Sequence, residues 1–140
     1  MATLVLPEMK SADRRRVSGH PLVLLVDDYS VVREACALFC ERSGFRVAQA
    51  GDGPEAVQKA LLLRPAAIVL DLLLPTIPGW EVAMALRSDA RTAKTPILAT
   101  SGLHRTEGER KARAAGATHY LPKPFDGFTL VRRLREMLGI

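Results

Sequence analysis

The sequence predicts an α/β fold, a doubly wound five-stranded parallel sheet with helices on both faces. Three observations predict it. Five short apolar segments alternate along the chain with five segments of helical, amphipathic spacing. Short loops join these segments, as right-handed crossovers between parallel strands require. The first apolar segment is unbroken by polar residues, which suits a strand covered on both faces.

The first half of the chain shows how its elements are bounded. Residues 22–26 are a continuous apolar run, which predicts the first strand, and the helix that follows ends where Gly44 offers a stop. Residues 45–50 predict a second, shorter strand. Asp52 and Pro54 then supply a cap and a first-turn proline, so a second helix begins there.

The second half repeats this alternation of strand and helix. The remaining strands are predicted at residues 66–70, 96–100 and 119–121, and the remaining helices at 80–87, 105–115 and 128–138. Residues 1–20 mix prolines and charges without hydrophobic periodicity. We therefore expect an N-terminal extension at 1–20 and one folded domain at 21–140.

Composition supports a single globular domain. The chain has 140 residues, of which 48 % are hydrophobic and 25 % charged. Its two cysteines, Cys36 and Cys40, are four apart in a predicted helix and are interpreted as small packing residues rather than a redox pair. No apolar run reaches the length of a membrane span and no signal peptide pattern begins the chain, so we expect a cytoplasmic protein with no membrane partner.

Polar residues interrupt this pattern at one place in particular. Asp27, Asp28, Asp71, Ser101 and Lys123 all fall at or just after the ends of predicted strands one, three, four and five. The carboxyl ends of parallel strands form one edge of the sheet, where ligands bind in folds of this class. We therefore expect these five side chains to meet.

The chemistry of this set suggests phosphoryl transfer. Converging carboxylates repel one another unless a cation intervenes, and Mg²⁺ prefers oxygen ligands. Asp71 is the candidate nucleophile, because a carboxylate can form an aspartyl phosphate. Lys123 and Ser101 would offer a positive charge and a hydroxyl donor to the phosphoryl oxygens. The alternative for Asp27 and Asp28 is that they only cap the following helix.

Four segments together carry a family resemblance. They are LVLLVDD at 22–28, IVLDLLLPTIPG at 68–79, PILATSG at 96–102 and HYLPKPF at 119–125. In this order and spacing the chain resembles the receiver domain of bacterial response regulators, the CheY-like family, over about residues 22–139. The resemblance implies a flavodoxin/CheY-like (βα)5 fold with strand order 2-1-3-4-5.

The resemblance also implies a role for each site residue. Asp71 would be the phosphoacceptor. Asp28 would bind Mg²⁺ directly, Asp27 would act largely through water, and the backbone carbonyl of Leu73 would complete the protein ligands. Lys123 would contact the phosphate, preceding a peptide bond to Pro124 that is typically cis in the family.

A conformational switch is implied as well. Ser101 matches the family's switch hydroxyl and Tyr120 its aromatic switch residue; the alternative for Tyr120 is a half-buried strand tyrosine. The switch would remodel the surface of residues 105–115, 119–121 and 128–138 for a downstream protein partner. The phosphodonor would be a histidine kinase or a histidine phosphotransfer protein, and the chain would be no enzyme beyond assisting its own phosphorylation and dephosphorylation.

Two apolar positions predict a long-lived phosphate. In the family, the residues two beyond the phosphoacceptor and two beyond the switch hydroxyl influence hydrolysis, and here they are Leu73 and Leu103. Neither side chain can orient an attacking water. We therefore expect slow autodephosphorylation. Gly102, in contrast, leaves room for a donor to approach Asp71.

Other classes of protein fit less well. The net charge is +5, but eight basic against four acidic residues in 104–140 come with no helix-turn-helix or zinc-finger pattern, which argues against direct nucleic-acid binding. A nucleotide-binding module would need a glycine-rich phosphate loop after the first strand. A Mg²⁺-dependent phosphatase of the haloacid-dehalogenase type would need an acid at Leu73, and a degenerate receiver would lack site residues that are present here. The chain could be a stand-alone receiver or part of a larger regulator.

Overall fold

The computed structural model describes residues 20–140, so residues 1–19 of the predicted extension lie outside the described part of the chain. Five parallel strands form one sheet in the order β2-β1-β3-β4-β5, which confirms the predicted topology. The strands are β1 (Leu22–Val26), β2 (Arg46–Ala50), β3 (Ala67–Asp71), β4 (Ile97–Ser101) and β5 (His119–Pro122). The helices are α2 (Ser30–Arg42), α3 (Gly53–Leu63), α4 (Gly79–Arg87), α5 (Arg105–Ala115) and α6 (Gly127–Leu138).

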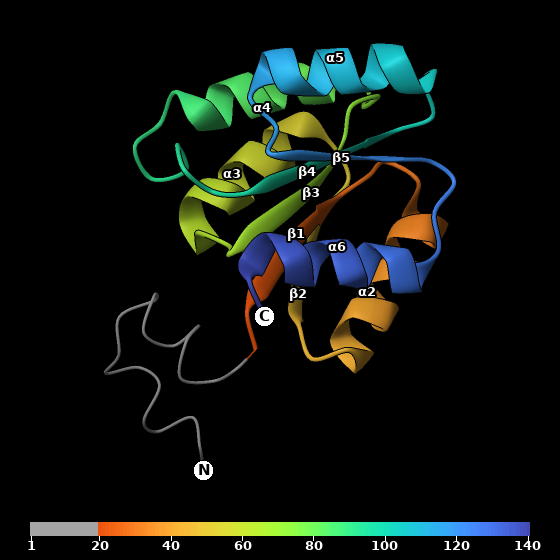
Figure 1. Ribbon diagram of the computed structural model, residues 1–140. Coiled ribbons are helices and arrows are strands. Elements are labelled where there is room, and N and C mark those ends of the chain that lie inside the picture. The colour runs from red at the N-terminus through yellow and green to blue at the C-terminus, as the bar shows by residue number, and fades with distance from the viewer. Residues whose placement is uncertain (1–19) are drawn as a thin grey trace.

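The helices cover both faces of the sheet (Figure 1). On one face, α3, α4 and α5 bury a cluster that includes Leu24, Leu70 and Ile97 from the strands. On the other, α2 and α6 pack over a second cluster around Leu25 and Leu98. Because side chains alternate along a strand, β1, β3 and β4 supply both clusters. Each central strand is therefore buried on both sides, as the unbroken apolar runs predicted.

The predicted element boundaries are right to within a residue or two, with one informative difference. β3 and β4 each run one residue further than expected, so that Asp71 and Ser101 are the last residues of their strands. The ladders explain this difference, since Asp71 is aligned with Thr100 on β4 and Ser101 with Pro122 on β5. Both side chains are therefore held by regular sheet geometry and not by a loop.

Local residues begin and end the helices as their chemistry predicts. Asp52 caps α3, because its side chain accepts a hydrogen bond from the amide of Glu55 at 2.9 Å. After α2, Gly44 adopts a φ of 102°, which a residue with a Cβ avoids. Cys40 is buried in the cluster under α2, which agrees with a packing role, and burial raises the pKa of its thiol to about 12.

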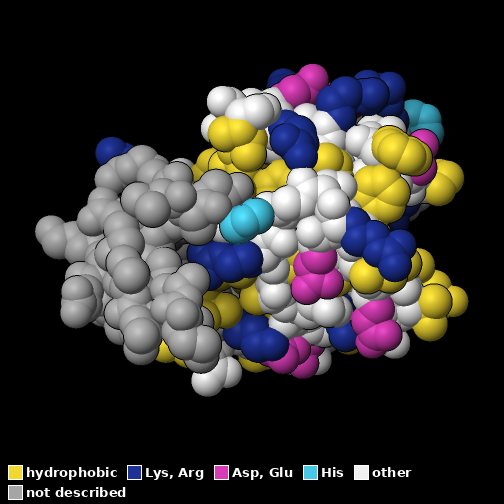
Figure 2. All heavy atoms as spheres, turned by 90° about the horizontal axis from the view of Figure 1, so that it is seen from below, with side chains coloured by type: hydrophobic (Ala, Val, Ile, Leu, Met, Phe, Trp, Pro, Cys, Tyr) yellow, Lys and Arg dark blue, Asp and Glu magenta, His cyan; other side chains and the backbone are white. Residues whose placement is uncertain are grey.

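The side of the molecule formed by α2 and α6 has no single sign of charge. Figure 2 shows basic, acidic and hydrophobic side chains interspersed on this face. Phe128 of α6 is 75 % exposed, although its ring packs edge-on against Phe39 of α2 with centroids 4.9 Å apart. This aromatic pair joins the two helices on their side of the sheet.

Candidate functional site

Three carboxylates meet at the carboxyl-terminal edge of the sheet. Asp27 and Asp28 follow β1 directly, and Asp71 ends the neighbouring strand β3. One oxygen from each of the three side chains lies within 4.8 Å of the others. The fold therefore brings together two acidic segments that are far apart in the sequence, as their positions at strand ends predicted.

Lys123 connects two of these carboxylates. Its Nζ lies 2.8 Å from Oδ2 of Asp27 and 3.1 Å from Oδ2 of Asp71. It follows β5, and the Lys123–Pro124 peptide bond is cis, as the resemblance implied. The three side chains are 27 %, 13 % and 6 % exposed for Lys123, Asp27 and Asp71. The ammonium group is therefore a largely buried counterion for a pair of carboxylates.

Burial and pairing act in opposite directions on these groups. Burial raises the pKa of Asp71, and the hydrogen bonds from Leu73 and Lys123 offset only part of that effect. Burial alone would lower the pKa of Lys123, but its bonds to Asp27 and Asp71 outweigh burial and raise it. Lys123 is therefore held in its charged form, while the buried carboxylate of Asp71 is in an environment that penalises its charge.

The second oxygen of each of the two paired carboxylates accepts a hydrogen bond from a nearby backbone amide. Oδ1 of Asp71 accepts a hydrogen bond from the amide of Leu73, and Oδ1 of Asp27 accepts one from the amide of Tyr29, both at 2.9 Å. Such turns, in which a side chain bonds the backbone two residues on, fix its rotamer. The cap of α2 is Tyr29, with no side-chain capping bond and no acid in the first turn. Helix capping therefore does not explain Asp27 and Asp28.

The loop after β3 returns so closely to Asp71 that it requires a glycine. A Cβ on Gly79 would lie 2.0 Å from the carbonyl oxygen of Asp71. The amide of Gly79 donates a hydrogen bond to the carbonyl of Leu72 at 2.8 Å. The start of α4 is therefore anchored against the residue that precedes the loop, while the side chain of Leu73 points outward and is 45 % exposed.

Ser101 and Tyr120 are joined through the backbone. Ser101 is fully buried at the end of β4, and its Oγ accepts a hydrogen bond from the amide of Leu103 at 2.9 Å. The hydroxyl of Tyr120 donates to the carbonyl of Ser101 over a long 3.5 Å. The Tyr120 ring packs with Leu72 and Ala112 under α5. The two predicted switch residues are thus in contact, although their side chains do not bond each other directly.

The donor set at this edge fits Mg²⁺. All three acids offer hard oxygen ligands, and Asp28 is exposed, so at least one carboxylate is open to a hydrated ion. Asp27 and Asp71 share a single ammonium group between them. One positive charge for three carboxylates leaves the cluster negative, which a divalent cation would correct.

Sequence reasoning missed two residues that support the site. Arg33 of α2 donates to the carbonyl of Asp27 at 2.6 Å and to the side chain of Gln49 at 3.0 Å, so it fastens the helix to the ends of β1 and β2. Gly108 of α5 makes space for Tyr120, since a Cβ there would lie 2.1 Å from the tyrosine hydroxyl. A glycine inside a predicted helix was the available signal for Gly108. Arg33 gave no such signal.

Comparison with known families agrees with this geometry. The family model described as the response regulator receiver domain matches residues 23–135. The chain belongs to this family. It is therefore a receiver domain, the phosphoacceptor module of two-component signalling. Within residues 20–140, none of the helices has both the length and the apolar character of a membrane span.

Related proteins show both the likeness and its limits. The receiver domain is 36 % identical over 118 residues to the DNA-binding dual master transcriptional regulator RpaA of Synechocystis, covering 84 % of this chain and 49 % of that protein. The chain thus spans about half the length of the curated relatives it matches.

Solved structures share the fold over nearly their full length. The chemotaxis response regulator CheY4 of Vibrio cholerae is 34 % identical with a TM-score of 0.80, covering 85 % of this chain and 99 % of that one. The receiver domain of sensor histidine kinase PA1611 from Pseudomonas aeruginosa is 29 % identical with a TM-score of 0.80, covering 86 % and 99 %, and was solved with magnesium coordinated in its active site cleft.

Proposed function

We propose that Asp71 of this receiver domain accepts a phosphoryl group from the phosphohistidine of a histidine kinase or a histidine phosphotransfer protein. One observation carries the proposal. Lys123 lies between Asp27 and Asp71 at the carboxyl edge of the sheet, so a buried nucleophile, a cation and a second acid are already in contact. This is the arrangement that phosphoryl transfer to a carboxylate requires.

In the proposed reaction, an Oδ atom of Asp71 attacks the phosphorus and the bond from phosphorus to the donor histidine breaks. The bonding electron pair leaves with the imidazole, which takes up a proton. Lys123 exchanges its contact with the Asp71 carboxylate for one with a phosphoryl oxygen, and the Ser101 hydroxyl donates to another. Mg²⁺ held by Asp28, Asp71 and the Leu73 carbonyl, with Asp27 acting through water, would supply positive charge opposite the phosphoryl oxygens.

The surroundings of Asp71 suit an approaching donor protein. Tyr29, Val32 and Leu73 are 63 %, 37 % and 45 % exposed, and they follow β1 and β3 on the chain near the acidic edge. Exposed apolar side chains of this kind favour a protein contact. A Cβ on Gly102 would meet nothing within 4 Å, so the site is also open on the side where β4 ends. These features support transfer from a protein donor.

The same proposal includes the switch. To donate to the phosphoryl group, the Ser101 side chain would turn toward Asp71, which would draw its Oγ away from the Leu103 amide and shift the start of α5. Because Tyr120 bonds the Ser101 carbonyl and packs under α5, its ring would move as well. The surface of α5, β5 and α6 would then change its affinity for a downstream protein. The receiver acts as a phosphoacceptor that assists its own phosphorylation and dephosphorylation.

The test uses acetyl phosphate as a small donor and intact mass as the readout. The wild-type protein should gain the mass of one phosphoryl group in Mg²⁺ buffer and gain none in EDTA. The Asp71→Asn variant should gain none in either. Asp89→Asn, which changes a partly exposed acid just after α4, is the matched control and should be labelled like wild type. Labelling that persists in Asp71→Asn would overturn the assignment.

A further inference from the structure

Of the three acids at the edge of the sheet, Asp28 is the one held least by its own side chain. Asp27 and Asp71 each bond Lys123 and a backbone amide. The Asp28 side chain is exposed and makes no hydrogen bond or ion pair with any residue of 20–140. One of its oxygens nevertheless lies within 4.8 Å of an oxygen from each of the other two acids. The position of Asp28 therefore depends on the backbone that carries it.

Arg33 holds that backbone from the side of α2. Its Nη1 donates to the carbonyl of Asp27 at 2.6 Å, and this carbonyl belongs to the peptide unit that joins Asp27 to Asp28. The amide of Asp27 donates to the carbonyl of Ala50, at the end of β2, at 3.1 Å. Because a peptide unit is planar, fixing its carbonyl also fixes the direction in which the chain enters Asp28. Arg33 thus orients the one acid whose side chain has no bond of its own.

The guanidinium group of Arg33 is itself fixed by β2. Its Nε donates to the side-chain oxygen of Gln49 at 3.0 Å. Gln49 is aligned with Leu25 of β1, and its own carbonyl accepts a hydrogen bond from Lys59 of α3. A Cβ on Gly51 would lie 3.3 Å from Nη1 of the arginine, so the chain after β2 passes close to the guanidinium. Two nitrogens of one planar group thus connect β2 to the chain that leaves β1, which the single nitrogen of a lysine cannot do.

We propose that Arg33 is a positioning residue for the metal ion: it holds the peptide between Asp27 and Asp28 so that the Asp28 carboxylate is oriented to bind Mg²⁺. The proposal rests on the proposed function, because it concerns the ion that the proposed reaction uses. Residues that orient metal ligands without touching the metal contribute about 10- to 100-fold to its affinity. Loss of Arg33 should therefore weaken metal binding although every ligand residue is still present.

Charge alone predicts the opposite effect. Arg33 carries a positive charge next to a site for a cation, and like charges repel. If charge were its only contribution, removing it would tighten the binding of a divalent ion. If Arg33 only braced α2 against the sheet, removing it would lower the free energy of unfolding and leave the metal affinity of the folded protein unchanged. The sign of the change in metal affinity therefore distinguishes the three roles.

The experiment titrates the full chain with Mn²⁺, which prefers the same oxygen ligands as Mg²⁺, and measures the free ion by electron paramagnetic resonance. Arg33→Met should weaken Mn²⁺ binding about tenfold. Arg33→Lys keeps the charge but can replace only one of the two hydrogen bonds, so it should bind Mn²⁺ severalfold more weakly than wild type. Gln49→Leu keeps Arg33 and removes its support on β2, and should have an effect similar to that of Arg33→Lys.

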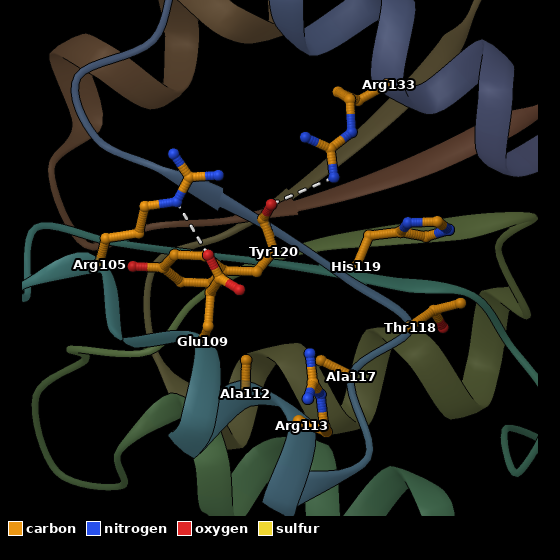
Figure 3. A pocket seen from close by; sticks show the side chains of 9 residues that line it. All are labelled: Arg105, Glu109, Ala112, Arg113, Ala117, Thr118, His119, Tyr120 and Arg133. Atoms are coloured by element: carbon orange, nitrogen blue, oxygen red, sulfur yellow. Dashed lines mark hydrogen bonds and ion pairs between the residues drawn. The ribbon is translucent and has the colours of Figure 1, made fainter. Parts of the chain in front are cut away.

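Arg133→Met is the matched control. Figure 3 shows Arg133 of α6 reaching the backbone carbonyl of Tyr120, a bond of 3.1 Å, so this variant also removes one positive charge and one bond from an arginine to a strand carbonyl. The partners of Arg133 are this carbonyl and Glu136, both outside the acidic edge. Arg133→Met should therefore bind Mn²⁺ like wild type. Urea unfolding in EDTA measures the stability of each variant separately from its metal affinity.

Unchanged or tighter Mn²⁺ binding by Arg33→Met would overturn the proposal, as would an equal loss of affinity in Arg133→Met. Should Arg33→Met fail to fold, wild-type affinity in both Arg33→Lys and Gln49→Leu would overturn it in the same way. If wild type itself binds no Mn²⁺, the metal site of the proposed function fails and this proposal fails with it. If wild type binds Mn²⁺ and the variants of Arg33 and Gln49 bind it equally well, only the role of Arg33 fails.

Discussion

At the scale of single residues, Lys123 organises the site before any phosphate arrives. Its ammonium group bonds one oxygen of Asp27 and one of Asp71, and each of these carboxylates bonds a backbone amide two residues on with its other oxygen. Neither carboxylate can rotate without breaking two hydrogen bonds. The nucleophile is therefore held in one orientation before the donor binds, so little conformational entropy has to be lost to orient it for the reaction.

The residue two beyond Asp71 should control how long the phosphate lasts. Leu73 is exposed near the nucleophile and offers no polar atom on its side chain. Replacing it with asparagine would place an amide where an attacking water could be oriented, so Leu73→Asn should accelerate hydrolysis of the phosphorylated protein severalfold. The measurement is decay of the phosphorylated mass in Mg²⁺ buffer after removal of acetyl phosphate.

Leu73→Met is the control for this change, since methionine keeps the size and apolar character of the side chain. It should decay at the wild-type rate. Loss of the phosphoryl group from wild type within seconds would contradict the expectation of slow autodephosphorylation, and equal rates for Leu73→Asn and wild type would show that this position does not direct the water.

The residues of the site could be predicted because their positions follow from topology. Asp27, Asp71 and Lys123 end or follow strands of a parallel sheet, and one edge of such a sheet collects all of them. The pairing of Lys123 with Asp27, in contrast, depends on side-chain rotamers that the strand pattern does not determine. Arg33 supports Asp27 from a helix face that looks like any solvated one. Such supporting contacts depend on packing between elements.

At the scale of elements, α5 is shaped around Tyr120. Gly108 lies inside this helix, where glycine costs about 1 kcal/mol relative to alanine. The space that the missing Cβ leaves is occupied by the tyrosine hydroxyl. The helix therefore gives up intrinsic stability at the position where the ring of Tyr120 lies against it.

Gly108→Ala should displace Tyr120 while leaving the fold intact. The new methyl group would collide with the hydroxyl, and the ring can leave because it is held only by one long hydrogen bond and by its packing against Leu72 and Ala112. NMR contacts between the Tyr120 ring and Ala112 should disappear. Gly102→Ala, whose Cβ would meet nothing within 4 Å, should keep them. Unchanged ring contacts in Gly108→Ala would show that α5 moves instead of the ring.

A single arginine joins the elements at the opposite end of the sheet. Arg87, the last residue of α4, donates to the carbonyls of Gly116 and Thr95 at 2.8 and 2.7 Å. It also reaches the carbonyls of Thr92 and Ala93 at 3.3 and 3.2 Å. The guanidinium group thus ties α4 to the loops that enter β4 and β5, and burial lowers its pKa.

Arg87→Lys should therefore be more destabilising than a conservative change usually is. An ammonium group cannot reach all of these carbonyls at once, so we expect a loss of about 1–3 kcal/mol in the free energy of unfolding. Urea denaturation measures it. Arg91→Lys is the control and should change stability much less, because the pair of Arg91 with Asp89 is exposed and screened by solvent. Equal effects at the two positions would contradict the role of Arg87 as a tie between loops.

The helix and strand limits were predictable where a capping residue marks them, as Asp52 and Gly44 do. The ends of β3 and β4 were each missed by one residue, because strand pairing in the sheet extends past the last apolar side chain. The apolar pattern of one strand contains no information about where the neighbouring strand ends. Element limits at the acidic edge are therefore set by pairing between strands.

At the scale of the whole molecule, the sheet separates two apolar cores. Ile68 and Ile97 are register partners on β3 and β4 and are both fully buried in the core under α3, α4 and α5. Leu134 of α6 is fully buried in the core on the other face. A rigid sheet between two close-packed layers holds the acidic edge in place from both sides.

This arrangement predicts which core substitutions interact. Ile68→Val and Ile97→Val should each cost about 0.5–1.5 kcal/mol, and Leu134→Ala about 2–5 kcal/mol. Because Ile68 and Ile97 are neighbours in one cluster, their combined cost should differ from the sum of the single costs by about 0.5 kcal/mol or more. Ile97→Val and Leu134→Ala lie in separate clusters and should add to within about 0.5 kcal/mol. Urea unfolding of the singles and doubles measures both couplings. A coupling energy well above about 0.5 kcal/mol between Ile97→Val and Leu134→Ala would contradict this separation of the two cores. It would mean that a change in the helices on one face of the sheet is transmitted to the helices on the other face.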